Sequence, residues 1–404
     1  MDKSIPVFTQ IIETLRKLAS RRAMRLAAGA WLLFGLIVSI VVAVQPDKHT
    51  VTPEYRHASE KWWQADPSDS LYNDDQGGYL YLPQAAILYT PYQLLPKRLG
   101  EPLWRLTGLA LLAFGLWRVA GVLDPKQQER LFLAATLLVI PSALSSARNG
   151  QVNLPLAGLL LLSVADLARA RWNSVTLWLL LSILLKPIAL APALLAAACF
   201  APLRLRLLGG LALALAAAYL HPSSSFVTGE YHHFWTKLTL AGQPAIGERF
   251  SDFFGMLWHW GLHPAPLIIS ACRALAAVAT FCFALLAMRR FRGNLTLQAL
   301  AVMLLAALYL MLFNPRTEEN SFVMLAGFTA LLAARDFLAF DLRRGTWLTL
   351  FCLLLAVENY GFIYPLTKIW FKPLITTGFL LTLVLGKFSL LQTEKAEEIL
   401  APRR

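Results

Sequence analysis

The sequence predicts an all-α, polytopic membrane protein with about twelve transmembrane helices. Of its 404 residues, 57% are hydrophobic and only 15% are charged, a composition that excludes an ordinary soluble domain. Apolar runs of about 20 residues, the length that crosses a bilayer as a helix, recur from Met24 almost to the C-terminus. These runs are continuous and rich in Leu and Ala, whereas barrel strands would be short and alternating.

The placement of the basic residues is the third observation. The chain has 37 Lys and Arg against 24 Asp and Glu, a net charge of +13. In the predicted topology 23 of the basic residues, those near the two termini included, fall on the side of the N-terminus and 14 elsewhere, so the excess indicates topology rather than nucleic-acid binding.

The N-terminal residues 1–23 are expected to form an interfacial helix on the cytoplasmic leaflet, because apolar side chains share one helical face beside basic residues. The first span, 24–44, follows directly. Its apolar run is too long for a signal-peptide core, which predicts an uncleaved anchor with its N-terminus inside.

Residues 45–102 are expected to form a first long outer segment. Its stretch 80–96 is apolar but contains three prolines, and we expect a surface helix there rather than a span. In the alternative scheme 80–96 crosses the membrane and 174–200 is a single span, which would place Arg169 and Arg171 outside. The positive-inside bias favours the first scheme.

In the favoured scheme residues 1–404 form one integral-membrane domain with a second long outer segment at 222–263. Long segments of this kind usually carry function. The remaining spans are expected at 103–122, 130–147, 153–168, 174–186, 188–202, 206–221, 264–288, 295–313, 321–338, 346–361 and 368–390.

No metal site, cofactor or disulfide framework is predicted. The four cysteines lie inside apolar runs without metal-ligand spacing, and no Gly-rich phosphate loop, GxSxG or HExxH motif occurs. His232 and His233 are adjacent, which gives poor shared metal geometry, so proton handling or sugar stacking is the alternative. Asp166 and Glu358 lie within or near spans, where pairing with a neighbouring group would explain them.

Lys186 interrupts a long apolar run, and Pro187 behind it breaks the helix. Ionisable residues at membrane depth are hypotheses of function by default. One interpretation is a lysine that extends to the outer interface from a short helix. We favour the other, in which Lys186 binds a phosphate in a wet cavity.

Five motifs together resemble glycosyltransferase family 87 of the GT-C superfamily, membrane enzymes that use polyprenyl-phosphate sugars. Each motif alone is weak, but they occur in the family's order between residues 55 and 325. They are YRHASEKWW at 55–63, GGYLYLPQAAILYTPYQLLP at 77–96, NGQVN at 149–153, LLKP at 184–187 and NPRTEENSFVML at 314–325.

The resemblance implies a GT-C-like helical fold and a sugar transfer, usually with inversion, on the extracytoplasmic side of a bacterial inner membrane. The implied partners are a polyprenyl-phosphate sugar donor, a lipid or glycan acceptor, and membrane lipids. The motifs do not specify the sugar, and our own hypothesis favours a hexose such as mannose. Such chemistry needs a carboxylate to take the hydroxyl proton and cations to stabilise the leaving phosphate.

The resemblance also implies an acidic catalytic residue in the first outer segment. Relatives often carry an aspartate where this chain has Val51. Glu54 is the nearest carboxylate and our first choice as general base, with Asp74 and Asp75 next.

For the donor phosphate we expect Lys186 and Arg316, with Arg148 next. The alternative for Arg316 is a local ion pair with Glu318 or Glu319, worth about 0–1 kcal/mol. The other residues expected to line the substrate cavity are Tyr55, His57, Tyr81, Asn149, Gln151, Asn153, His232, His233, Glu319 and Asn320.

A lipid or glycolipid transporter is the rival function, because it would also need many helices and buried charge. Transporters often show paired broken helices in two repeats. This chain has one clear break, at Lys186–Pro187, without a counterpart in its second half. A non-catalytic envelope scaffold is a third interpretation, which would leave Lys186 without a purpose.

Overall fold

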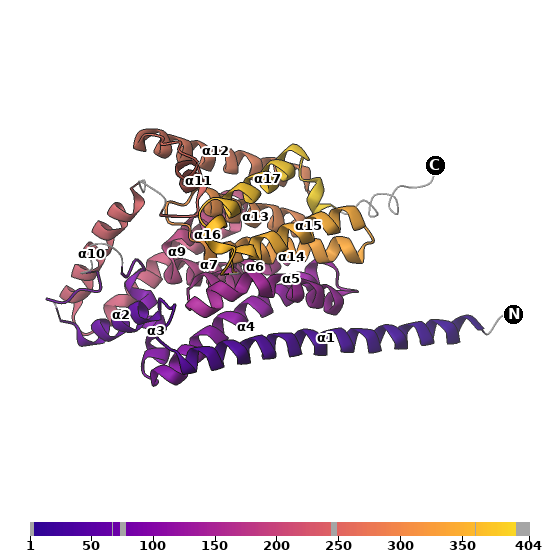
Figure 1. Ribbon diagram of the computed structural model, residues 1–404, viewed down its shortest axis with the longest axis horizontal. Coiled ribbons are helices and arrows are strands. Elements are labelled where there is room, and N and C mark those ends of the chain that lie inside the picture. The colour runs from indigo at the N-terminus through magenta and orange to yellow at the C-terminus, as the bar shows by residue number, and fades with distance from the viewer. Residues whose placement is uncertain (1–3, 67, 73–77, 244–248, 360, 393–404) are drawn as a thin grey trace.

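The computed structural model describes residues 4–66, 68–72, 78–243, 249–359 and 361–392, and every regular element in these ranges is a helix (Figure 1). Seven helical segments in them are long and apolar enough to cross a membrane. These segments lie in α1 (Ser4–Val44, from Ala19), α4 (Lys97–Leu123), α5 (Gln128–Asn149), η2-α9-η3 (Ala201–Leu203, Arg204–Ala216 and Ala217–Leu220), α12 (Pro266–Arg290), α13 (Leu295–Phe313) and η4-α14 (Glu319–Phe322 and Val323–Leu338).

Shorter helices complete the architecture. Four of the segments are apolar, namely α6 (Asn153–Leu167), α7 (Trp172–Leu185), η1-α8 (Pro187–Ala189 and Leu190–Cys199) and α17 (Phe371–Leu385). The others are α2 (Thr52–Gln64), α3 (Pro83–Gln93), α10 (Ser224–Gly242), α11 (Phe253–His259), α15 (Leu342–Ala356), η5 (Val357–Asn359), α16 (Tyr364–Thr367) and η6 (Ser389–Leu391).

The all-helical fold is confirmed, and each predicted span overlaps one of these helices. Seven candidate spans meet the length and composition of a crossing, so twelve crossings stay a prediction. The segment 80–96 contains only the 11-residue α3. The expected interfacial helix and first span form one continuous helix, α1, because the sequence between them contains no proline or glycine to end it.

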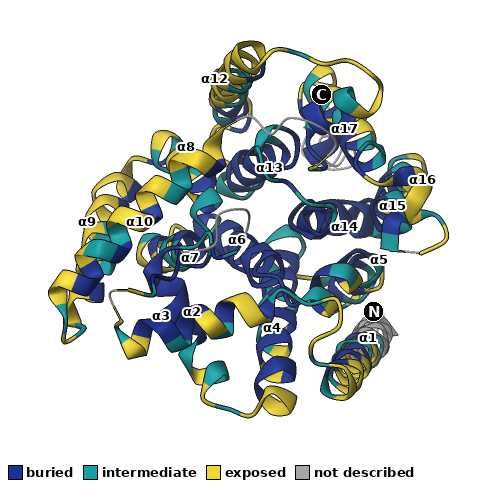
Figure 2. Ribbon diagram, turned by 60° about the vertical axis from the view of Figure 1, so that its left-hand side comes forward, coloured by how far each residue is buried: buried dark blue, intermediate teal, exposed yellow. Residues whose placement is uncertain are grey.

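The centre of the molecule is formed by α6, α13 and α14 (Figure 2). Every residue of α6 is buried, and this helix packs against α4 and α7, while α14 packs against α5 and α15. Gly158 lets α4 and α6 cross closely, since a Cβ there would lie 2.4 Å from a backbone atom of Leu111. Small residues at helix crossings are typical of membrane bundles.

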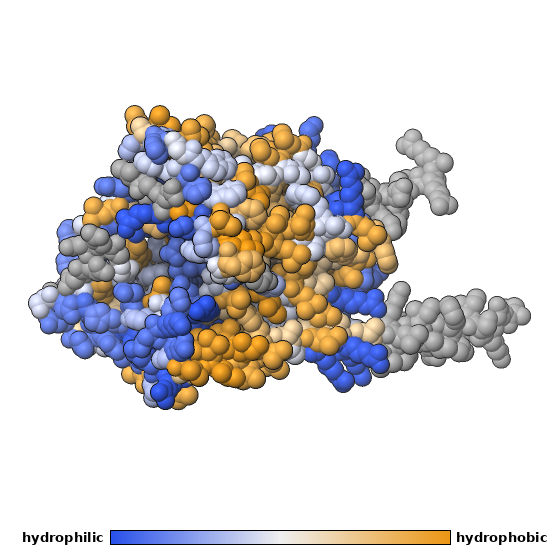
Figure 3. Space-filling model, in the orientation of Figure 1, coloured by the Kyte–Doolittle hydropathy of each residue, from blue (hydrophilic) through white to orange (hydrophobic). Residues whose placement is uncertain are grey.

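The outside of the bundle is apolar around its middle. Only 28% of the candidate span in α1 and 11% of that in α12 are buried, so their large hydrophobic side chains face outward. Figure 3 shows hydrophobic residues across the middle of one face and hydrophilic residues at the end where α2, α3 and α10 lie. This pattern is expected of a membrane protein with one large polar end.

A buried ion pair lies at the far end of α6 from that polar end. Asp166 contacts the Arg118 guanidinium at 2.5 Å and accepts a hydrogen bond from the indole of Trp178 at 2.8 Å. Asp166 therefore pairs with neighbours, as the sequence suggests, and lies away from the candidate site.

Candidate active site

The start of α2 is fixed against the turn between α5 and α6. The Val51 amide donates to the Asn149 carbonyl at 3.1 Å. Gly150 adopts a φ of +73°, and a Cβ there would lie 2.6 Å from the Thr52 side chain. Only glycine tolerates this combination of positive φ and close approach without strain. This contact places Glu54, in the first helical turn of α2, near the residues that follow Gly150.

A buried ion pair in α4 holds the start of α2 in place. Arg105 donates to the Glu101 carboxylate at 2.8 Å, and both side chains are buried. The same carboxylate accepts hydrogen bonds from the Thr52 hydroxyl and, at 3.2 Å, from the Tyr89 hydroxyl. A buried charge needs such partners. Our sequence analysis missed this cluster, although the i,i+4 spacing of Glu101 and Arg105 is a signal.

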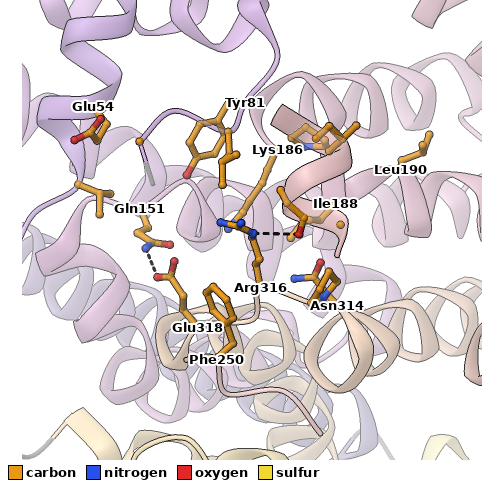
Figure 4. Close-up of a pocket in the computed structure, with 18 of the residues that line it drawn as sticks. Glu54, Tyr81, Gln151, Lys186, Ile188, Leu190, Phe250, Asn314, Arg316 and Glu318 are labelled. Carbon is orange, nitrogen blue, oxygen red and sulfur yellow. Dashed lines mark hydrogen bonds between the residues drawn. The ribbon is translucent and has the colours of Figure 1, made fainter. Parts of the chain in front are cut away.

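A cavity of about 480 Å³ lies between α2, the α7–η1 break, α10 and the segment after α13 (Figure 4). Four charged residues from these segments line it: Glu54, Lys186, Arg316 and Glu318. Tyr55, Tyr81 and Gln151 line it as well, and its apolar walls include Leu80, Ile188, Leu190, Leu238 and Phe250.

The break in the helix presents Lys186 to this cavity. α7 ends at Leu185, and Lys186 has an extended backbone before Pro187, as residues that precede proline prefer. The Lys186 ammonium donates to Asn153 Oδ1 at 2.8 Å. An ammonium has three N–H groups, and the described residues accept from one of them, which leaves two for a ligand.

A line of hydrogen bonds joins Lys186 to the carboxylate of Glu318. Asn153 Nδ2 donates to Gln151 Oε1 at 2.7 Å, and Gln151 Nε2 donates to Glu318 Oε2. The two amides of the NGQVN run therefore orient a cation and an acid on opposite sides of the cavity floor. Of the two, Asn153 is fully buried and acts beneath the cavity rather than in its lining.

Arg316 is positioned by α10 and by an aromatic ring. Its Nε donates to the Ala241 carbonyl at 3.2 Å, and its guanidinium lies 5.7 Å from the centre of the Phe250 ring. Burial lowers the pKa of Arg316 from its ordinary value. Within the described residues no carboxylate forms an ion pair with Arg316, so the local ion pair that we considered is not present there.

Two tyrosines form the wall beside Glu54. The hydroxyls of Tyr55 and Tyr81 lie 3.1 Å apart, and their rings meet edge to face with centroids 5.2 Å apart. Burial raises the pKa of both phenols well above the ordinary value, so both stay neutral near pH 7. Glu54 itself is exposed at the cavity.

Residues 79–315 match the family model described as Glycosyltransferase family 87. The chain belongs to glycosyltransferase family 87. This membership confirms the family that the five motifs indicate, and it makes the protein a membrane glycosyltransferase with a donor and an acceptor substrate. No curated protein matches the chain.

A second cavity of this family 87 glycosyltransferase has a volume of about 710 Å³ and shares Glu318 with the first. It is lined by four residues that the sequence places in the substrate site and that do not line the first cavity with Lys186. These four residues are Arg148, Asn149, Glu319 and Asn320.

Three predicted histidines line neither cavity. His57 is exposed on α2, and His232 and His233 are exposed on α10. Asp74 and Asp75 lie outside the described residues. In the part of the chain that is described, no group of three or more His, Cys, Asp or Glu side chains is placed to hold a metal.

Glu230 of the glycosyltransferase is a further residue that sequence reasoning missed. Its buried carboxylate accepts hydrogen bonds from the Ser70 hydroxyl at 3.0 Å and from the Leu71 amide at 3.1 Å. His233 Nδ1 lies 2.9 Å from the same hydroxyl. Burial raises the pKa of Glu230. This carboxylate ties α10, which also lines the first cavity, to the segment that follows α2.

Proposed function

We propose that the protein transfers a sugar, with a hexose such as mannose favoured, from a polyprenyl phosphate to a hydroxyl of a lipid-linked or cell-envelope acceptor. The observation that carries the proposal is the meeting of Lys186 and Arg316 with Glu54 and Glu318 around one cavity. Two cations for a phosphate and a carboxylate for a hydroxyl proton are what this reaction requires.

In this proposal the first cavity holds the donor. The two free N–H groups of Lys186 and the guanidinium of Arg316 bind the phosphate oxygens, the guanidinium by its planar fork. The apolar wall that includes Ile188 and Leu190 covers the first part of the polyprenyl chain. Leu190 is 42% exposed, so this wall continues to the outside of the bundle.

The proposed chemistry is a single displacement. The acceptor oxygen attacks the anomeric carbon while the bond from that carbon to the phosphate oxygen breaks, and its electron pair leaves with the polyprenyl phosphate. The hydroxyl proton passes to a carboxylate, for which Glu54 is our first choice and Asp74 and Asp75 are the alternatives. Displacement from the opposite side inverts the anomeric configuration.

We further propose that this site faces the extracytoplasmic side of a bacterial inner membrane. The basic residues at the other end of the bundle, among them Arg118, Arg171 and Arg344, support this orientation through the positive-inside bias. A donor carried on a lipid suits a site on that side, where soluble nucleotide sugars are absent.

The test is turnover of radiolabelled polyprenyl-phosphate mannose by purified protein, with a native lipid extract as the source of acceptor. We expect labelled product from the wild type and little product when Glu54, Asp74 and Asp75 are all replaced by their amides. Normal turnover by a correctly folded triple variant would contradict the catalytic assignment. A transporter would bind the labelled donor and leave it chemically unchanged.

A further inference from the structure

The second cavity lies across Glu318 from the first, and its wall is built from widely separated parts of the chain. It is bordered by α1, α5, η5, α16 and the start of α17. Of the described residues, Glu318 alone lines both cavities. A molecule in the second cavity would therefore approach the donor site at this carboxylate.

One side of the second cavity is apolar and borders the outside of the bundle. Ile37, Val38, Val41 and Val42 of α1 line it. Ile37 is 49% exposed and Val41 is 47% exposed, so the wall is part of a helix that faces lipid. An alkyl chain lying along α1 would bury this surface without leaving the membrane.

The opposite side carries buried oxygen atoms that accept no hydrogen bond from the described residues. Glu358 is 5% exposed and forms an ion pair with Lys372 Nζ at 3.4 Å, but within the described residues neither of its carboxylate oxygens accepts a hydrogen bond. The side-chain oxygen of Asn149 is also buried without a donor. Unsatisfied buried acceptors of this kind need an explanation, and a ligand that donates hydrogen bonds supplies one.

The charges in this cavity favour a neutral ligand. Three carboxylates, Glu318, Glu319 and Glu358, line it together with Arg148 and Lys372. The Lys372 ammonium already donates to the Glu319 carbonyl at 2.8 Å. A phosphate would meet these carboxylates, whereas sugar hydroxyls would donate to them.

We propose that the second cavity binds the acceptor, a glycolipid whose sugar hydroxyls contact Glu358 and Asn149 and whose alkyl chain lies against α1. The assignment rests on the proposed transferase function. In this arrangement an acceptor hydroxyl reaches the donor from the Glu318 side, and donor and acceptor enter the bundle through different walls.

The direct test uses a dodecyl glucoside that carries a photoreactive diazirine in its alkyl chain, with the protein in phosphatidylcholine nanodiscs. Irradiation should label peptides of α1 around residues 37–42. Excess dodecyl glucoside should prevent this labelling, whereas dodecanol, which has the chain without the sugar, should not. Equal competition by both compounds would overturn the proposal, because it would show binding to the lipid-facing surface alone.

Two tryptophan variants on one helix test the cavity itself. Ser145→Trp places a large ring in the cavity. We expect it to lower the affinity for the probe, and with it the labelling, about tenfold. Leu137→Trp is the matched control, because Leu137 lies on the same helix and is 58% exposed away from the cavity. Labelling that is unchanged in a folded Ser145→Trp protein would refute the assignment. If that variant does not fold, the competition with wild type still decides.

Kinetics separate this inference from the proposed function. With a lipid extract as acceptor, Ser145→Trp should raise the KM for acceptor about tenfold and leave the KM for donor unchanged. A raised donor KM with an unchanged acceptor KM would overturn the acceptor assignment while the transferase function stood. Absence of transfer by wild type would refute the proposed function, and the labelling would still decide whether the cavity binds a glycolipid.

Discussion

Replacing Lys186 by methionine removes the charge from the first cavity while keeping a long, flexible side chain. The ammonium uses one N–H for Asn153 at 2.8 Å and has two left for the phosphate. A hydrogen bond to a charged group contributes about 1.5–3 kcal/mol, so the loss of one lowers kcat/KM for the donor about 10- to 100-fold. The larger value applies where the bond strengthens as the phosphate leaves with added charge.

The same substitution has a cost in stability. Asn153 is fully buried, and its Oδ1 loses the donor that Lys186 provides. An unsatisfied buried acceptor costs about 1–3 kcal/mol. Thermal unfolding in detergent must therefore show that the variant is folded at the assay temperature before its rate is interpreted.

The assay measures initial rates over a range of concentrations of radiolabelled polyprenyl-phosphate mannose. Lys97→Met is the matched control, because it removes the same charge from an exposed ion pair with Asp47 that lines neither cavity. We expect its kcat/KM to stay within about twofold of wild type, as for other exposed pairs. A folded Lys186→Met protein with wild-type kcat/KM would refute the phosphate assignment. Without product from wild type, other lipid-linked sugars are the next donors to try.

Three further substitutions test separate parts of the site. Glu54→Gln should lower kcat about 100- to 10,000-fold with little change in donor KM, and single-turnover rates near wild type would place the base elsewhere. Gly150→Ala should lower the free energy of unfolding by at least about 1–2 kcal/mol because of the φ of +73°, and an unchanged Tm would contradict this. Glu230→Ala should speed hydrogen exchange at the Leu71 amide, which loses its acceptor; unchanged exchange would show that the segment after α2 is held by other contacts.

The fold follows from the sequence wherever one physical effect dominates. Continuous apolar runs predict the helices, and the break at Lys186–Pro187 is confirmed because proline excludes the α conformation from the residue before it. The sequence predicts an interfacial helix followed directly by a span, and both lie in the one long helix α1. Basic residues do not end a helix, and nothing else near residue 23 does so.

The site was harder to predict, because its members come from irregular segments. In the turn after α13, Arg316 lines the first cavity, Glu319 lines the second, and Glu318 lines both. A turn has no side-chain periodicity, so the sequence does not predict which of these neighbouring residues lines which cavity. Arg148 lies in the last turn of a helix, where its direction depends on which helices pack beside α5. Which helices pack there is set by the tertiary structure, and the sequence pattern of α5 does not show it.

The two carboxylates of the first cavity differ in a way that predicts different roles. Glu318 accepts a hydrogen bond from Gln151, lies 3.3 Å from Asn320 Nδ2 and caps the N-terminus of η4. It would have to give up one of these contacts to take a substrate proton. Glu54 is exposed and accepts no hydrogen bond from the other residues drawn around the cavity (Figure 4), so its oxygens are available to a hydroxyl.

Glu318→Gln tests this difference. The glutamine Oε1 can still accept from Gln151 and still cap η4, so we expect kcat to fall by about tenfold or less, the value of a positioning contact. The loss should be far smaller than that of Glu54→Gln, measured in parallel by single turnover with saturating donor. An equal or larger loss from a folded Glu318→Gln protein would transfer the role of base to Glu318. That result would fit the position of Glu318, whose carboxylate lines both the proposed donor cavity and the proposed acceptor cavity.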